Sequence, residues 1–359
     1  MNFNSTSGFL SAFGIKVGDL NLPMSFFSIV FSKGVNKKGI GFFIFPIAAL
    51  FCFLFIHLAK GNIDEGLFFK NIFRLLFPFV TACLLAVRFS NGNKNRFVEF
   101  SSGILFLCAI DIIPSIIFYA PQFIISVISG NIYFIKDKNI LLQNTNYTAF
   151  FCFVAMLSIY LSYKIEGVLS KKHIFFAFLL SCLSMSRAYI ASQIIILFCF
   201  FVPDRFFKKK MRFASIFVFF AMISTVFYFL AKFNFDDTFI RGIRTDVDGS
   251  AATKFEIIMY TSSVIKKYGW DFLIGLGPQI IDQSLLVTYA SHSMVGIMSE
   301  LGLFIIVYIM PFFMLALKKP IFFFCNSGFF LAALTTSFPI AYLTPWLMIV
   351  YISLYQKNV

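Results

Sequence analysis

Long apolar runs alternate along this chain with short polar segments that carry lysine and arginine. Many of the runs approach the length of about 20 residues that a helix needs to cross a bilayer. The pattern therefore predicts an all-α, polytopic integral membrane protein with about 11 transmembrane helices, within a range of about 10–12. The expected crossings lie at 9–31, two within 39–87 around the break "KGNIDEG", 97–120, 146–163, two within 173–202, 213–231, 292–317 and two within 321–356.

Composition agrees with this prediction. Hydrophobic residues make up 59% of the 359 residues and charged residues 13%, with 55 Phe, whereas a soluble domain is about 45–50% apolar and about 25% charged. The seven cysteines lie singly in apolar runs without CxxC spacing, which favours packing residues over a disulfide framework or a metal site. The first apolar run contains Lys16 and Asp19 and has no short basic leader, so we expect no cleavable signal peptide.

The net charge of +14 raises the alternative of a nucleic-acid partner, which the distribution of the bases argues against. Short loops rich in lysine and arginine remain in the cytoplasm. We therefore expect no nucleic-acid partner and place the basic loops inside the cell. The basic clusters are Lys33/Lys37/Lys38, Arg88/Lys94/Arg96, Lys164/Lys171/Lys172, Arg205/Lys208/Lys209/Lys210/Arg212, Lys318/Lys319 and Lys357.

The segment 173–202 is flanked by basic clusters on both sides, so it must cross the membrane an even number of times. Two short helices of about 14 residues, joined by a tight turn at "MSRAY", satisfy this requirement, although each is shorter than the usual span. Neighbouring helices must then shield the arms, or the bilayer must thin. This topology places Arg187 at the outer surface.

The same topology places the loop 232–291 outside, within a single membrane domain that covers 1–359. Loops of this length are functional or disordered. Aromatic residues throughout the loop and the turn signal "GLGP" favour an ordered lid. Three of its bases, Arg241, Arg244 and Lys254, are candidate ligands for an anion or, alternatively, ordinary solvated charges.

His292 follows this loop, at the mouth of the next apolar run. On a helix it shares a face with Gly296 and Ser299, and Glu300 lies beside that face and deeper. An ionisable residue inside a span faces the protein interior. The alternative is an interfacial histidine that anchors the helix and a glutamate with a structural role.

Two further ionisable residues have open assignments. Arg187 is either a ligand for an anion or a snorkelling side chain at the membrane surface. Asp111, three residues before Pro114, is better explained as structural than as catalytic.

Together, the outer-face cations and a histidine suit transfer of a group from a lipid diphosphate. The diphosphate leaves as a stable anion, so cations that stabilise its charge are sufficient and no cofactor or metal is required. A neutral histidine takes the proton from an acceptor hydroxyl.

Several motifs then resemble one family. "LLSCLSMSRAYIAS" resembles the Ser-Arg-Gly/Ala turn between two helices of the O-antigen polymerase and O-antigen ligase superfamily. "LLQNTNYTAFF" is similar to its Asn-x-Asn helix start. "GLGP" followed by "HSMVGIMSELGLF" is similar to its Gly-x-Gly, His-Asn/Ser and Glu-x-Gly signature. The matched segments span 141–310 in the order and spacing of the family.

The resemblance implies a metal-independent glycosyltransferase with a GT-C-like fold, which acts on undecaprenyl-diphosphate-linked glycan at the periplasmic face of the bacterial inner membrane. Such enzymes work beside a chain-length regulator. His292, Arg187 and Arg241 or Arg244 match catalytic positions of the family. Lys254 stands where many members carry arginine, and lysine lacks the bidentate fork. The substrate-binding residues implied are Lys254, Glu300, Asn146 and Ser293.

Three functions remain in competition. A polymerase joins lipid-linked repeat units, and a ligase transfers finished glycan to the lipid A core by the same chemistry. A lipid-linked glycan flippase belongs to a different class and is expected to show internal repeats, which the sequence does not display. We favour the polymerase.

Overall fold

The computed structural model describes residues 41–63, 65–71, 75–76, 95–128, 145–201, 213–215, 217, 221, 266–278 and 294–335. Over these ranges the chain is helical and has no strand. The elements in chain order are α3 (Gly41–Ala59), α4 (Glu65–Asn71), α6 (Arg96–Phe118), α7 (Ala120–Ile128), α8 (Thr145–Leu161), η6 (Ser162–Glu166), α9 (Lys171–Leu183), α10 (Arg187–Phe201), η8 (Gly269–Leu273), α15 (Met294–Leu301), η10 (Gly302–Ile305), α16 (Ile306–Lys318) and α17 (Pro320–Thr335).

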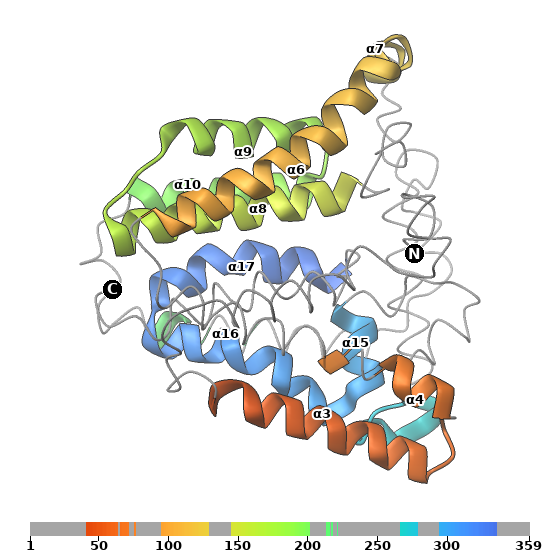
Figure 1. Cartoon of the computed structure of the whole chain (residues 1–359). Coiled ribbons are helices and arrows are strands. Elements are labelled where there is room, and N and C mark those ends of the chain that lie inside the picture. Colours follow the sequence, from red (N-terminus) through yellow and green to blue (C-terminus); the bar gives the residue numbers. More distant parts are fainter. Residues whose placement is uncertain are drawn as a thin grey trace, which may run out of the picture.

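Most of the long helices lie side by side with their axes roughly aligned, consecutive ones running in opposite directions, and α6 is inclined to the others (Figure 1). Helix α8 packs against α6, α9 and α10, and its side chains are buried from Tyr147 to Leu161. This helix is apolar on every face, the composition expected of a helix enclosed by others. Helix α10 also packs against α17, α17 against α16, and α16 against α3.

The outer helices are apolar toward the surroundings and more polar toward the interior. On α6, Phe106 and Ile117 are each 69% exposed, while Asp111 and Ser115 are buried. Large exposed apolar faces mark surfaces that contact another apolar phase or a partner. Further buried polar residues include Ser101, Thr148, Ser158, Ser162, Ser181, Ser184, Ser186, Ser192, Gln193 and Asn326.

Two helical stretches within the described ranges, Arg96–Phe118 and Asn146–Glu166, are long and apolar enough to cross a membrane. The second, of 21 residues, extends for about 30 Å at the rise of an α-helix, close to the thickness of a bilayer's hydrocarbon core. These stretches coincide with two expected crossings.

The two helices and the turn predicted in 173–202 are present, and their crossing of the membrane stays a prediction. Helix α9 has 13 residues and α10 has 15, and the turn between them covers Ser184 to Ser186. Met185 has φ 55° at this turn, a left-handed conformation that reverses the chain. The expected break at "KGNIDEG" is also present, because α3 ends at Ala59 and α4 begins at Glu65.

Two expected elements differ from the structure. The crossing at 97–120 does not end in a loop, because α7 follows α6 after the single non-helical residue Tyr119. The crossing at 292–317 is not one α-helix, because a 3-10 turn that begins at Gly302 with φ 53° separates α15 from α16. The expected crossings at 9–31 and 213–231, and the chain after Thr335, lie wholly or largely outside the described residues.

Asp111, for which the sequence favours a structural role, bonds to a neighbouring helix. The Thr148 hydroxyl of α8 donates to its Oδ2 at 2.5 Å, and both residues are buried. The bond ties α6 to α8 inside the bundle, where an unpaired carboxylate would be costly.

Basic residues from separate segments gather at one end of the bundle. Arg96, at the start of α6, pairs with Glu166 of η6 at 3.2 Å. Lys164 lies over the Tyr160 ring at 5.8 Å, and that ring contacts Phe322 in the first turn of α17. Several of the clusters used to predict the topology therefore lie on the same side, as the sequence requires.

Candidate functional site

The turn between α9 and α10 meets the start of α8. The Ser186 hydroxyl donates to Asn146 Oδ1 at 2.8 Å, across 40 positions of sequence. The Ser184 hydroxyl donates back to the Ser181 carbonyl at 2.6 Å, which closes the turn. This contact joins the "NTN" and "SRA" motifs. Arg187 is the first residue of α10 and follows directly from the bonded serine.

Aromatic packing holds this junction in register. Tyr189 is fully buried and its ring lies 6.0 Å from Phe150 and 6.5 Å from Phe153, both on α8. Because Tyr189 is two residues from Arg187, this packing fixes the backbone that carries the arginine. Buried aromatic pairs of this kind add about 0.5–1.5 kcal/mol beyond their burial.

A second junction joins "GLGP" to "SELG". The Leu276 amide donates to the Ser299 carbonyl at 3.1 Å, and the Gly277 amide donates to the Glu300 carbonyl at 3.2 Å. These carbonyls lie in the last turn of α15, just before the 3-10 turn that begins at Gly302. The amides of a segment distant in sequence therefore dock on the end of α15.

Gly275 makes this approach possible. An added Cβ would lie 2.3 Å from the Glu300 carbonyl oxygen, and the residue has φ 99°. Both the space and the backbone conformation require glycine. The first glycine of "GLG" is thus explained by the closeness of the loop to α15.

His57 of α3 completes the second junction, and the sequence reasoning did not single it out. It is fully buried, and Asn62 Nδ2 donates to its Nδ1 at 3.1 Å. A Cβ added at Gly277 would lie 3.2 Å from the same nitrogen, so the "GLG" backbone packs against the ring. Phe53 contacts both His57 and Phe304, with ring centroids 4.7 and 5.4 Å apart. The available signal was a histidine in an apolar run, shortly before a break.

Glu300 is 1% exposed and its neighbour Ser299 is fully buried. A carboxylate at the interrupted end of an apolar helix therefore faces the protein interior, as the sequence predicts. Its role in substrate binding stays a prediction. Nearby, Lys60 pairs with Asp271 at 3.8 Å, but both side chains are exposed, so this pair contributes little to stability.

The other candidate residues lie outside the described residues: His292, Ser293, Arg241, Arg244 and Lys254. His292 lies two residues before Met294, where α15 begins. The structure thus brings together Asn146 with the Ser-Arg turn, and "GLG" with Glu300. Among the described residues, no group of three or more His, Cys, Asp or Glu side chains could hold a metal ion.

Both junctions lie toward the end of the bundle away from Arg96 and Lys164 (Figure 1). At this end the interior presents a buried carboxylate, a buried imidazole and an amide, beside a loop that docks through its backbone. Such groups can orient hydroxyl-rich ligands by hydrogen bonds.

Comparison of the chain with models of known protein families, with curated proteins and with solved structures gives no match.

Proposed function

We propose that this chain is a polytopic membrane glycosyltransferase, an O-antigen polymerase that joins undecaprenyl-diphosphate-linked repeat units at the periplasmic face of the inner membrane. One observation carries the proposal. Motif segments that are far apart in sequence meet in two pairs, through the Ser186–Asn146 bond and through the amides of Leu276 and Gly277. This pairing is expected if the resembling segments build one site.

The proposed membrane placement has separate support. Apolar side chains cover the outside of α6, α9 and α10, while serines, Asp111 and Gln193 are buried. In water this distribution would expose a large apolar surface. In a bilayer the apolar side chains would contact lipid and the polar ones would stay inside the protein. The end with Arg96 and Lys164 then faces the cytoplasm, and the paired motifs face the periplasm.

The proposed reaction breaks the bond between the anomeric carbon of the donor glycan and the diphosphate oxygen. The acceptor hydroxyl oxygen bonds to that carbon and its proton passes to His292, while undecaprenyl diphosphate leaves with the electron pair. Arg187, Arg241, Arg244 and Lys254 stabilise the charge that develops on the diphosphate. Asn146, Ser293 and Glu300 bind the sugars.

Lipopolysaccharide from a strain that lacks this gene tests the proposal on a gel. Core bearing a single repeat unit, without a ladder, is the result expected of a polymerase. Core alone, with long glycan on the carrier lipid, would instead identify a ligase. An unchanged ladder would overturn glycosyl transfer in this pathway and favour transport or another polysaccharide.

His292→Ala tests the base directly. We expect ladder formation to fall by about 10²- to 10⁴-fold, the usual contribution of a general base, while the amount of chain in the membrane is unchanged. A ladder of near-normal intensity would remove His292 from the chemistry.

Arg187→Lys and Arg187→Ala separate the two interpretations of that arginine. A guanidinium that grips phosphate through two hydrogen bonds predicts partial activity for lysine and almost none for alanine. Equal and mild effects on the ladder would identify a snorkelling side chain.

A further inference from the structure

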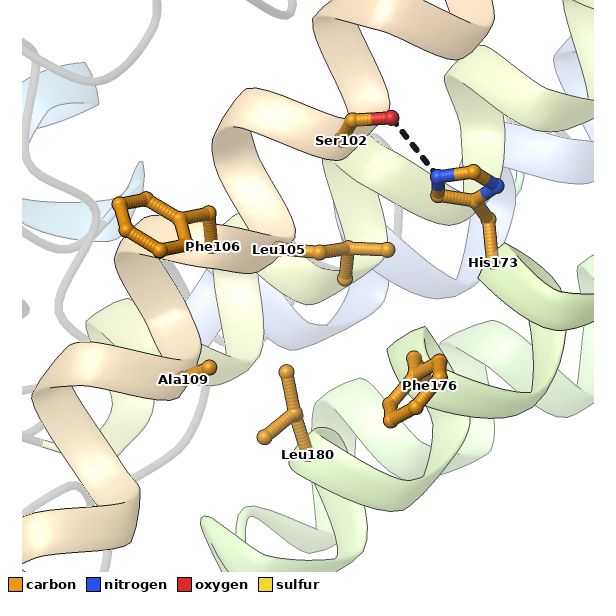
Figure 2. Close-up of a pocket in the computed structure, with 7 residues that line it drawn as sticks. All are labelled: Ser102, Leu105, Phe106, Ala109, His173, Phe176 and Leu180. Atoms are coloured by element: carbon orange, nitrogen blue, oxygen red, sulfur yellow. Dashed lines mark hydrogen bonds between the residues drawn. The ribbon is translucent and has the colours of Figure 1, made fainter.

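A groove runs between α6 and α9 on the outside of the bundle (Figure 2). Leu105, Phe106 and Ala109 of α6 line one side, and Phe176 and Leu180 of α9 line the other. The groove is open, because Phe106 is 69% and Phe176 is 53% exposed. In the proposed membrane placement these walls offer an acyl chain closer van der Waals contact than a flat helix surface does.

One end of the groove is polar. His173 lies in the first turn of α9, and its Nε2 is 2.7 Å from Ser102 Oγ of α6. The Ser102 hydroxyl donates to the Val98 carbonyl at 2.8 Å, so it accepts the Nε2 proton of the imidazole. Nδ1 of the ring is hydrogen-bonded to Ser170. These bonds fix the imidazole at the point where the groove changes from polar to apolar.

Two lysines without an ion pair to a described residue adjoin this polar end, where Glu99, one turn before Ser102 on α6, is the exposed acid. Lys171 and Lys172 immediately precede His173, are exposed, and form no ion pair with a described residue. Cations at a helix N-terminus are unfavourable because they oppose the helix dipole. The first turn of α9 contains no acid that would offset the two lysines. The nearby Arg96 and Glu166 compensate each other. An external anion at the two lysines would offset this unfavourable arrangement.

We propose that the groove binds one anionic phospholipid, with an acyl chain between α6 and α9 and the phosphate headgroup at Lys171 and Lys172. The basic end faces the cytoplasmic leaflet in the proposed orientation, and the surface potential of that leaflet is negative because of its anionic lipids. A zwitterionic lipid would fill the groove but leave the lysines without net counter-charge. The inference rests on the proposed membrane placement and not on glycosyl transfer.

Quenching of a tryptophan by brominated acyl chains tests this site in the full chain. The reporter is Phe176→Trp, in a background in which Trp270→Phe and Trp346→Phe remove the native tryptophans. The protein is reconstituted in phosphatidylcholine vesicles that contain brominated phosphatidylglycerol or brominated phosphatidylcholine. The control reporter is Ile117→Trp on α6, which is 69% exposed and has no lysine or arginine between Arg96 and Lys136 in the sequence around it.

We expect brominated phosphatidylglycerol to bind at the Phe176→Trp reporter at least fivefold more tightly than brominated phosphatidylcholine, since each lysine near a charged lipid contributes roughly fivefold. The control reporter should show little preference. Lys171→Gln with Lys172→Gln should reduce the ratio to about one. Lys318→Gln with Lys319→Gln, between α16 and α17, should leave it unchanged. Ala109→Phe fills the groove and should weaken quenching by both lipids without altering charge.

Equal quenching by the two lipids at the Phe176→Trp reporter would overturn the proposal. The same phosphatidylglycerol preference at both reporters would also overturn it, because surface charge alone would then explain the result. A preference that survives the loss of Lys171 and Lys172 would disprove the headgroup assignment. The readout needs no enzymatic activity, so failure of the proposed glycosyl transfer would leave it intact.

Discussion

At Gly275 the backbone lies against the end of α15, and this contact leaves no space for a side chain. Gly275→Ala would place Cβ 2.3 Å from the Glu300 carbonyl oxygen at a φ of 99°. We expect a loss of about 2–4 kcal/mol in the free energy of unfolding, measured by thermal unfolding in detergent. Gly269→Ala is the control, because its φ is 54° but nothing lies within 4 Å; it should cost about 1–2 kcal/mol. Equal losses would show that "GLG" does not dock as described.

The bond between Ser186 and Asn146 supports a second prediction at the residue scale. Ser186→Ala and Asn146→Ala should each lower stability by about 1 kcal/mol. The double variant should lose much less than the sum, because the bond is lost only once. If Asn146 also binds sugar, Asn146→Ala will reduce the glycan ladder more than Ser186→Ala does. Additive losses of stability would contradict the bond.

At the scale of elements, α10 and α17 pack through small residues. A Cβ added at Gly328 would lie 2.8 Å from Ser192 Cα, so the helix backbones would have to separate. Gly328→Ala should therefore destabilise the chain by about 1–3 kcal/mol, measured as the unfolding temperature in detergent. Ser327→Ala is the neighbouring control; its hydroxyl bonds only within its own helix, to Phe324, and it should change stability by less than about 0.5 kcal/mol. A neutral Gly328→Ala would argue against this crossing.

Across the whole molecule, the end of the bundle with Arg96 and Lys164 lies opposite the paired motifs (Figure 1). In a cysteine-free background, Met185→Cys lies in the α9–α10 turn and Leu169→Cys lies in the connection from η6 to α9. We expect a membrane-impermeant maleimide to label Met185→Cys from the periplasm, and to label Leu169→Cys only after the membrane is opened. The reverse pattern would place Arg187 in the cytoplasm and exclude it from periplasmic chemistry.

The apolar runs and the positions of lysine and arginine were sufficient to predict a helical chain, the break after α3, the stretches at α6 and α8, and the α9–α10 hairpin. The two helices of 173–202 and the turn between them were predicted from the charges on both sides of the segment, a pattern that needs no tertiary contact, and their crossing of the membrane stays a prediction. The burial of Glu300 followed from the cost of a charge in an apolar run.

The tertiary structure alone decided which segments, distant in sequence, contact one another. The end of α15 receives the amides of Leu276 and Gly277 at the Ser299 and Glu300 carbonyls, and no local pattern specifies so distant a partner. The same holds for His57, which an apolar run presents as an ordinary interior residue until the "GLG" backbone packs on its ring. Periodicity and charge determine where helices begin and which way they run, since these depend on neighbours in sequence and on the solvent. Packing between segments determines which polar groups share a site.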